Sequence, residues 1–327
     1  MLFRSDLIAY CWDKFLDSGD LRWLPRFPMV KSVVRAMDCI QEWSKKEGIP
    51  VEKFVVAGGS KRGWTTWMTG ATDHRVEAIV PIVIDVLNVD EQLFHHGATY
   101  GFWARALGDY VHHGIVQNPD HPRMQELHSM EDPYSYLDRL TLPKYIVNGS
   151  GDQFFVPDSS RFYYDDLQGE KHLYYVPNTD HGVDKNPASV TSIVAFYQMI
   201  IDGRARPEAT WTFEDDGSIR VRSDVPPLAV NLWQAHNPDA RDFRLDTIGK
   251  AYKPTALKAE PDGSWVGKAA PAAKGWTAAF IELEYDSGGL FPFRQTTAVR
   301  ITPDTLPHEG FDPKTLPYEG DLQKGKK

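Results

Sequence analysis

A short apolar run that ends in two glycines and a serine constrains the fold of this chain more than any other feature. Residues 53–58 read Lys-Phe-Val-Val-Ala-Gly, and Gly59, Ser60 and an apolar helical pattern with Trp64 follow directly. A continuous apolar run of this length is typical of a parallel strand that is buried on both faces. The segment therefore predicts a strand, a glycine turn and a helix, with Ser60 between the strand and the helix.

The segments around this turn alternate between helical and strand-like patterns. Their apolar periodicity predicts helices over 5–19, 28–48 and 189–201, and buried strands over 53–58, 78–84, 142–148 and 172–176. Strands that alternate with helices indicate an α/β fold with a parallel sheet. Residues 89–140 are rich in histidine and aromatic residues and interrupt this alternation. We expect them to form a mostly helical lid over the carboxyl edge of the sheet.

After about residue 206 the pattern changes to short alternating runs. Turn signals such as Asp215-Asp-Gly217 and Pro261-Asp-Gly263 separate these runs. Several short strands at this spacing are typical of an antiparallel sandwich. We therefore expect a partial α/β domain over 1–205, a β-sandwich domain over 206–303 and a loose C-terminal tail over 304–327.

Ser60 has the setting of a nucleophile elbow, in which a strained turn between a strand and a helix projects a serine above a sheet. The backbone N–H of Lys61, at the start of the helix, would then help to stabilise an oxyanion. The pattern departs from Gly-x-Ser-x-Gly, because Arg62 takes the place of the second glycine and Gly63 follows it. The alternative is that Ser60 only caps the helix.

A nucleophilic serine needs a base, and the base needs an acid that orients it. Asp152 follows the strand predicted over 142–148, and His181 follows the strand predicted over 172–176. This order, serine then acid then histidine, is the order found in α/β-hydrolases. The sequence therefore predicts a triad of Ser60, His181 and Asp152.

Three other carboxylates compete with Asp152 for the role of the acid. They are Asp85, which also ends a predicted strand, and Asp158 and Asp180, which lie near the candidate loops. We rank Asp152 first because an acid loop typically places its carboxylate a few residues before a Val-Pro pair, here at 156–157.

Aromatic and histidine side chains of the chain allow further interpretations. Trp64, Tyr100 and Trp103 are candidates for a substrate pocket that is apolar or stacks on sugars, although lid aromatics more often form the lid's own core. The pairs at 95–96 and 112–113 are both His-His. Adjacent residues on a helix point about 100° apart, so neither pair shares a face for a metal. We expect no metal and no cofactor.

Charge, apolar length and cysteine content exclude several classes of protein. Lys and Arg number 36 against 45 Asp and Glu, a net charge of −9, which disfavours a nucleic-acid partner. The longest apolar stretch, residues 78–89, contains a carboxylate and is too short to span a bilayer. Cys11 and Cys39 could form one bridge, but two buried free thiols are favoured.

Three motifs resemble the PhoPQ-activated pathogenicity-related protein family. They are Gly58-Gly-Ser-Lys-Arg-Gly-Trp64, Asn148-Gly-Ser-Gly-Asp-Gln-Phe-Phe155 and Pro177-Asn-Thr-Asp-His181. The resemblance runs over nearly the whole chain. It implies an α/β-hydrolase-like fold with a C-terminal β domain, and an exported protein in the periplasm or outside the cell. The elbow is also similar, locally, to the Ser-Arg-x-Gly elbow of glucuronoyl-type carbohydrate esterases.

Two functions follow from these observations. The first is a serine hydrolase that cleaves an ester or amide in a small molecule, a sugar ester or a peptide. The second is a non-catalytic secreted binding or signalling protein on a hydrolase scaffold, since the resembling family includes secreted signalling proteins and a fold alone does not determine function.

The position of Ser60 in the chain gives a further expectation. Only 59 residues precede it, whereas a hydrolase sheet normally has several strands before the elbow strand. The strand at 53–58 would then lie at the edge of its sheet. We expect the chain to be an N-terminally truncated piece, whose missing part would carry a second oxyanion donor and any export signal. Such a piece can keep a triad without a working site.

Overall fold

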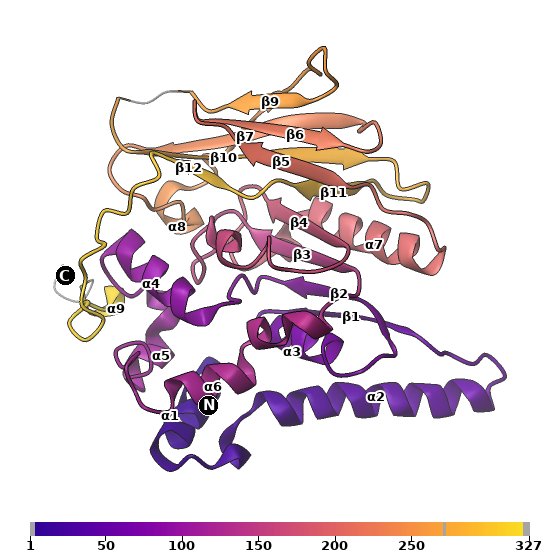
Figure 1. The fold of residues 1–327 in the computed structure, drawn as a ribbon, viewed down its shortest axis with the longest axis vertical. Helices are drawn as coiled ribbons and strands as arrows, with labels where there is room; N and C mark the ends of the chain where they lie inside the picture. The colour runs from indigo at the N-terminus through magenta and orange to yellow at the C-terminus, as the bar shows by residue number, and fades with distance from the viewer. Residues whose placement is uncertain (1–3, 271–272, 323–327) are drawn as a thin grey trace. The chain divides into compact units, whose positions relative to one another are not determined.

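The computed structural model describes residues 4–270 and 273–322 (Figure 1). Their contacts divide the chain into two compact units. The first contains residues up to 143 together with 162–170 and the residues from 306, and the second contains 144–161 and 171–305. This division does not follow the domain limits expected near residues 205 and 303, which stay a prediction.

The first unit consists mainly of helices around one pair of parallel strands. Its elements are α1 (Arg4–Ser18), η1 (Leu21–Trp23), α2 (Arg26–Lys46), β1 (Phe54–Gly59), α3 (Lys61–Gly70), β2 (Val76–Ile82), α4 (Val89–Tyr100), η2 (Arg105–Leu107), α5 (Gly108–His112), α6 (Met124–Glu131), η3 (Pro133–Arg139) and α9 (Glu319–Leu322). The strands β1 and β2 pair in parallel, with Val55 opposite Ala78 and Gly59 opposite Ile82. The predicted order of strand, turn, helix and strand is therefore confirmed.

Strand β1 lies at one end of the strand order. It pairs with β2, and no other strand within 4–270 or 273–322 pairs with its opposite edge. Its residues are half-buried, apart from Ala57, which is exposed. The predicted edge position of this strand is confirmed, although its sequence has the continuous apolar character of a strand covered on both faces.

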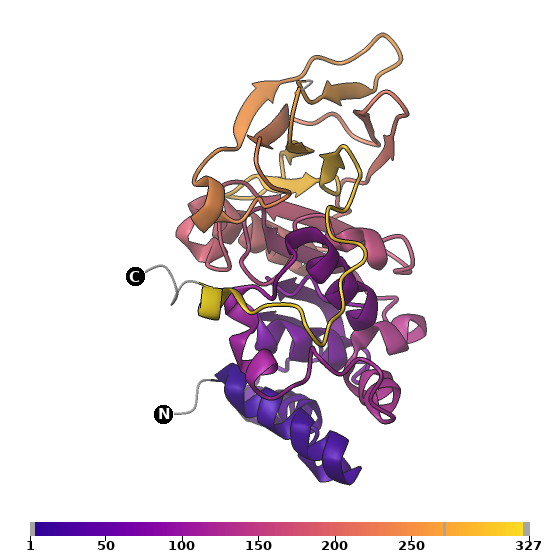
Figure 2. The ribbon, with the colours of Figure 1, turned by 90° about the vertical axis from the view of Figure 1, so that its left-hand side faces the viewer.

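The segment between β2 and the third strand is mostly helical, as predicted, with α4, α5 and α6 as its main elements. The predicted loose tail, in contrast, is held on this helical segment over 306–322 (Figures 1 and 2). His308 N–H donates to Ala98 O over 2.9 Å, and Trp103 N–H donates to Pro317 O over 2.8 Å. The ring of Phe311 packs where Gly97 has no side chain. Residues 323–327 of the predicted tail lie outside the described residues.

The second unit joins two parallel strands to two antiparallel sheets. Its elements are β3 (Lys144–Gly149), η4 (Ser159–Phe162, where the chain passes into the first unit), β4 (Lys171–Val176), η5 (Val183–Lys185), α7 (Pro187–Ile201), β5 (Ala209–Phe213), β6 (Ser218–Ser223), β7 (Ala229–Asn237), α8 (Leu245–Ile248), β8 (Lys253–Ala256), β9 (Trp265–Lys268), β10 (Trp276–Tyr285), β11 (Phe293–Thr296) and β12 (Arg300–Thr302). β3 and β4 pair in parallel from Lys144 opposite Lys171 to Gly149 opposite Val176.

The two antiparallel sheets pack on each other. One has the order β11-β10-β7-β8 with β12 beside β10, and the other has the order β5-β6-β9. Gly267 of β9 faces Leu232 of β7 and Ile281 of β10, which brings the sheets face to face. The α/β class with antiparallel sheets in the C-terminal part is thus confirmed. The strands β8, β9 and β11 were not predicted.

An aromatic cluster joins the parallel strands of the second unit to its antiparallel sheet. The ring of Tyr145 in β3 lies 5.2 Å from that of Phe196 in α7 and 5.1 Å from that of Phe293 in β11. The Tyr145 hydroxyl also hydrogen-bonds Ser192 Oγ over 2.6 Å. Burial of large aromatic side chains contributes strongly to stability, so this cluster fixes the position of β3 and the loop that follows it.

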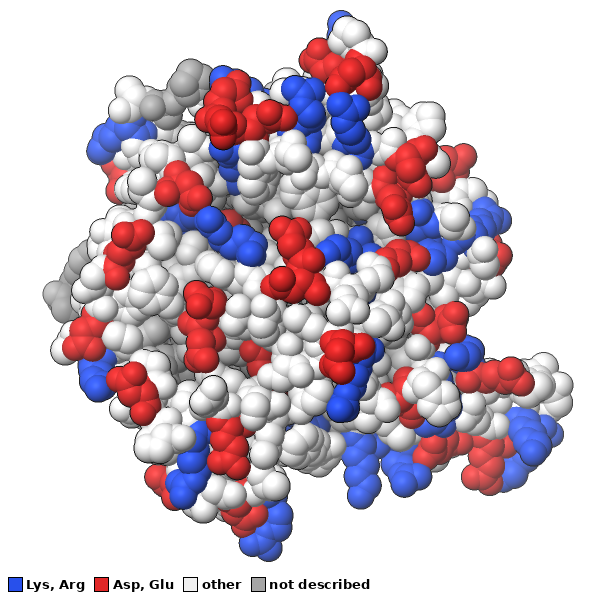
Figure 3. Space-filling model, in the orientation of Figure 1, with Lys and Arg blue, Asp and Glu red and all other residues white. Residues whose placement is uncertain are grey.

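Surface charges of both signs are interspersed on the face that Figure 3 shows. Several pair locally, as Lys46 does with Glu42 and Lys268 with Asp216. Within the described residues no helix is both long and apolar enough to cross a membrane. Both cysteines have free thiols, but neither is buried as expected, because Cys11 is half-buried and Cys39 is exposed.

Candidate active site

The backbone of Ser60 has an unusual conformation at the predicted turn. Its φ is 56° and its ψ is −125°, a region that residues with a side chain rarely adopt. Its N–H donates to Ile82 O over 2.8 Å, and its carbonyl accepts the first bond of α3 from Trp64 N–H over 3.0 Å. The Ser60 hydroxyl makes no capping hydrogen bond to the helix. A simple capping role therefore does not account for a serine here.

Two glycines allow β1 and α3 to approach each other closely at this turn. A Cβ on Gly58 would lie 2.7 Å from the carbonyl oxygen of Arg62, and one on Gly63 would lie 2.8 Å from Gly58 O. A Cβ on Gly59, in contrast, would meet nothing nearer than 4.0 Å. Gly63 thus supplies the close approach in this chain, although it stands one place later than in the usual elbow motif. Lys61 opens α3, so its N–H belongs to the first turn of the helix.

The predicted acid and base meet in the second unit. Asp152 Oδ2 lies 2.7 Å from His181 Nδ1, and Asp152 Oδ1 accepts a hydrogen bond from Phe154 N–H over 2.7 Å. Asp152 is 3% exposed. The His181 ring packs at 4.6 Å from the Phe154 ring. Its Nε2 is buried and has no hydrogen-bond partner among the described residues.

The loops after β3 and β4 hold this pair in place. Ser150 N–H donates to Val176 O over 3.1 Å, and Gly151 N–H donates to Thr179 O over 2.8 Å. Gly149 passes so close to the Asp180 carbonyl that a Cβ would not fit. Because the backbones of the two loops are bonded to each other, the acid and the base are positioned by rigid neighbours rather than by one flexible contact.

The rival carboxylates are bound elsewhere. Asp85 accepts a hydrogen bond from the Tyr163 hydroxyl over 2.5 Å, and Asp158 lies 2.7 Å from the guanidinium of the buried Arg241. Asp180 pairs with Lys185 and accepts from Gly182 N–H. Among the four candidates, Asp152 is the carboxylate that contacts the His181 ring.

The predicted site residues belong to both units. Ser60, Lys61, Trp64, Tyr100 and Trp103 lie in the first unit, and Asp152 and His181 lie in the second. The aromatic candidates are buried, with exposed fractions of 5% for Trp64, 6% for Tyr100 and 1% for Trp103. Trp64 Nε1 donates to Glu131 O over 2.5 Å, and Tyr100 stacks on Phe102. Of the three, Trp103 lines a described cavity.

The lid histidines have individual partners. His96 Nε2 accepts a hydrogen bond from Ala104 N–H over 3.1 Å, and His113 Nε2 lies 3.1 Å from an Asp6 carboxylate oxygen. In the part of the chain that the structure describes, no three histidine, cysteine or carboxylate side chains form a cluster that could hold a metal ion.

One polar pair in the lid had no signal in the sequence. His128 in α6 contacts Asp90 in α4, with 3.0 Å between Nδ1 and Oδ1, and both line the cavity that Trp103 borders. The two residues lie on different helices far apart in the chain, so no spacing pattern connects them.

Comparison with known proteins gives a family and a relative. The model of the PhoPQ-activated pathogenicity-related protein family matches residues 2–244. Autocrine proliferation repressor protein A of Dictyostelium discoideum is 38% identical over 332 residues, which cover 93% of this chain and 67% of that protein.

Solved structures resemble the chain only in part. Puromycin hydrolase has a TM-score of 0.36 at 18% identity, over 51% of this chain and 24% of its own. Acetyl xylan esterase 1 of Thermoanaerobacterium has a TM-score of 0.36 at 17% identity, over 46% of this chain and 45% of its own. Similarity at this level says nothing about activity.

The family match covers the elbow at Ser60, the Asp152–His181 pair and the whole parallel part of the fold. The curated relative extends the similarity to most of the remaining chain. The resemblance inferred from the three motifs is thereby confirmed, and the chain belongs to the PhoPQ-activated pathogenicity-related protein family.

Proposed function

We propose that this protein is a serine hydrolase that cleaves an ester or an amide. Ser60 is the nucleophile, His181 is the general base and acid, and Asp152 orients the imidazole. The Lys61 N–H supplies one donor to the oxyanion. The substrate is a small molecule, a sugar ester or a peptide with a carbonyl that Ser60 can attack.

The contacts of the His181 ring are the observation that carries this proposal. A carboxylate accepts hydrogen bonds, so the proposal assigns the ring proton to Nδ1, which lies 2.7 Å from Asp152 Oδ2. The neutral ring then has its lone pair on Nε2, which is buried and has no hydrogen-bond partner among the described residues. A buried acceptor without a partner costs stability, which is reasonable where the acceptor takes a proton during a reaction.

The backbone conformation of Ser60 supports the same proposal. A positive φ at a residue with a side chain costs about 1–3 kcal/mol, and such strain collects at functional sites. A glycine would form the turn without this cost. The hydroxyl makes no capping bond that would offset the strain. A nucleophile that has to project from the end of β1 explains why a serine is present.

The reaction then follows a double-displacement course. His181 Nε2 takes the proton of the Ser60 hydroxyl while Oγ bonds to the carbonyl carbon, and the carbonyl oxygen becomes an oxyanion. When the oxyanion collapses, the bond to the leaving group breaks and the imidazolium protonates that group. Water attacks the acyl-serine in the same way and restores Ser60, so no cofactor is consumed.

Covalent labelling tests this proposal without knowledge of the substrate. Ser60 Oγ attacks the phosphorus of a fluorophosphonate probe, fluoride leaves and His181 takes the hydroxyl proton. We expect one label on the folded protein and none on Ser60→Ala. Ser32→Ala, at an exposed position of α2, is the matched control and should label like the wild type. His181→Gln should label far more slowly. A folded wild-type protein that takes up no label, or a Ser60→Ala variant that labels normally, would contradict the proposal.

The name of the relative is a reason to test a second function, that of a non-catalytic binding or signalling protein. A protein that represses proliferation in an autocrine manner can act by binding a receptor rather than by catalysis. Purified wild type and Ser60→Ala would be added to growing cells in parallel. Equal repression by both favours the binding function, whereas repression by the wild type alone favours hydrolysis.

A further inference from the structure

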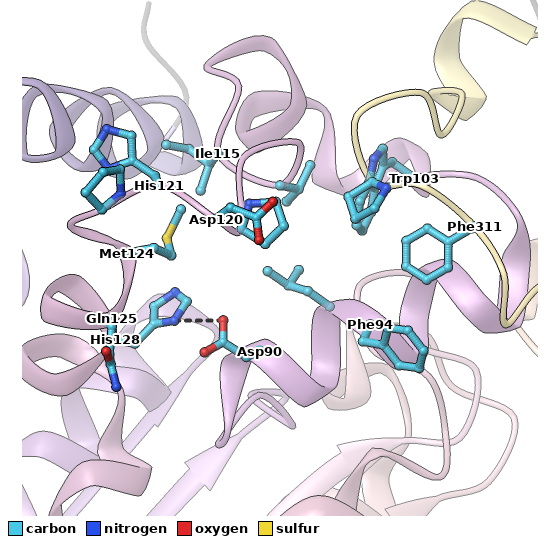
Figure 4. A pocket seen from close by; sticks show the side chains of 15 residues that line it. Asp90, Phe94, Trp103, Ile115, Asp120, His121, Met124, Gln125, His128 and Phe311 are labelled. Carbon is cyan, nitrogen blue, oxygen red and sulfur yellow. Dashed lines mark ion pairs between the residues drawn. The ribbon is translucent and has the colours of Figure 1, made fainter.

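A cavity of about 440 Å³ lies in the first unit, and its lining contains none of the residues proposed for catalysis (Figure 4). Side chains of α4 and α6, of the loop between α5 and α6, and of the segment at 311–313 form its walls. Neither Ser60 nor Trp64 lines it. Its volume is in the range of pockets that bind small molecules.

One end of the cavity is polar and acidic. His128 Nδ1 lies 3.0 Å from Asp90 Oδ1, and the other nitrogen of the ring is turned away from this contact (Figure 4). His128 is 8% exposed, and its Nε2 has no hydrogen-bond partner among the described residues. The contact with His128 lowers the pKa of Asp90, which therefore remains a carboxylate at neutral pH. Asp120 adds a second carboxylate at the rim, 3.6 Å from Lys314 Nζ.

The other end of the cavity is apolar and aromatic. The Phe311 ring lies 5.5 Å from the Phe94 ring and 6.3 Å from the Trp103 ring, nearly perpendicular to the latter. Met124 and Ile115 also line the cavity, but they lie on the side of His121 and His128 (Figure 4). Aromatic faces attract cations as well as apolar groups, and thioethers adapt to varied shapes.

We propose that this cavity binds a small organic amine with an aromatic or branched apolar body. The ammonium group would donate hydrogen bonds to the Asp90 carboxylate and to His128 Nε2, and the body would lie against Phe94, Trp103 and Phe311. This binding site is separate from the proposed hydrolase site and does not depend on it.

The chemistry of the polar end selects this class over its alternatives. An anionic ligand would be repelled by the Asp90 carboxylate. A purely apolar ligand would leave the buried His128 Nε2 without a partner and would remove water from Asp90. An amine satisfies both groups at once, because its charge opposes the carboxylate and its N–H groups match an acceptor nitrogen.

Calorimetric titration with three probes of similar shape tests the proposal. We expect phenethylamine to bind saturably and at least tenfold more tightly than 2-phenylethanol, which lacks the charge, and than 3-phenylpropanoate, whose charge is opposite. Equal affinity for the three probes, or no saturable binding of the amine, would overturn the proposal.

Variants then locate the site. Asp90→Asn should weaken phenethylamine binding at least tenfold, while Glu91→Gln, the adjacent exposed acid that does not line the cavity, should leave it unchanged. Met124→Trp should abolish binding by filling the cavity, and Ser60→Ala should bind like the wild type. Melting curves show whether each variant is folded. Normal binding by a folded Met124→Trp variant, or a loss with Glu91→Gln as large as with Asp90→Asn, would refute the assignment.

Discussion

Replacement of Ser60 by glycine tests whether the elbow is strained, independently of any substrate. At φ 56° and ψ −125° the serine side chain costs about 1–3 kcal/mol, which Ser60→Gly would release. Glycine also loses more conformational freedom on folding, a cost of about 0.5–1 kcal/mol. Because the hydroxyl makes no capping bond, little else is lost. The net expectation is a variant more stable by about 0.5–2 kcal/mol.

Thermal melting of the variant measures this gain. One kcal/mol corresponds to roughly 2–4 °C for a unit of 150–250 residues, so Ser60→Gly should melt roughly 1–8 °C above the wild type. Ser60→Ala retains Cβ and the positive φ and should melt near the wild type. Ser32→Gly, at an exposed position of α2, is the control for glycine entropy and should lose about 0.5 kcal/mol.

The order of the three variants decides the outcome. Relief of strain requires Ser60→Gly to be the most stable and Ser32→Gly the least. If Ser60→Gly is no more stable than Ser60→Ala, the turn stores no strain and the elbow loses its physical support. Both Ser60 variants should fail to label with fluorophosphonate. In Ser60→Gly the loss of labelling should accompany a gain in stability, which is the pattern expected of a residue kept for function.

Three further perturbations have directions that the structure fixes. Burial raises the pKa of Asp132 to about 6, so the native state holds this proton more tightly than the unfolded chain. The wild-type free energy of unfolding in urea should therefore fall, relative to that of Asp132→Asn, as the pH rises from about 4 to 6. Parallel pH profiles of the two proteins would refute this. Asp152→Asn should slow fluorophosphonate labelling by a factor of roughly 10³–10⁴ by favouring the wrong tautomer of the histidine, whereas Asp180→Asn should have little effect. Gly63→Ala should lower the free energy of unfolding, measured in urea, by about 1–3 kcal/mol, because its Cβ would lie 2.8 Å from neighbouring atoms. Gly59→Ala should leave it unchanged, because a Cβ there meets open space.

Local patterns were sufficient to predict the parts of the fold that depend on local chemistry. The turn at Ser60 is encoded by Gly58, near the end of β1, and Gly63, in the first turn of α3, because a Cβ at either position would clash with its neighbours. The loops that carry Asp152 and His181 follow strands with strong apolar runs, so their places along the chain were also predictable. These patterns could be recognised in the sequence because each depends on residues that are neighbours along the chain.

Elements that depend on distant partners could not be predicted in this way. All four residues of β8 are exposed, so the strand has no alternation of apolar and polar residues and exists because it pairs with β7. The segment after residue 305 has the Pro- and Gly-rich composition of a loose tail, but Phe311 and backbone bonds to Trp103 hold it on the first unit. The Asp90–His128 contact likewise joins two helices that only the tertiary fold brings together.

Trp64 was a candidate for a substrate pocket, but in the structure it has a structural role that affects the turn at Ser60. It lies on α3, one turn after Ser60, and its Nε1 donates to the carbonyl of Glu131. The carboxylate of that glutamate in turn accepts from Trp12 Nε1 and from the backbone N–H of the fully buried Arg26, whose guanidinium lies 4.4 Å from the Trp64 ring. Helices α1, α2, α3 and α6 are therefore tied to one buried residue, Glu131, and removal of a donor would leave one of its buried oxygens with a hydrogen bond fewer. A helix held in this way keeps its N-terminus fixed, and with it the turn from which Ser60 projects.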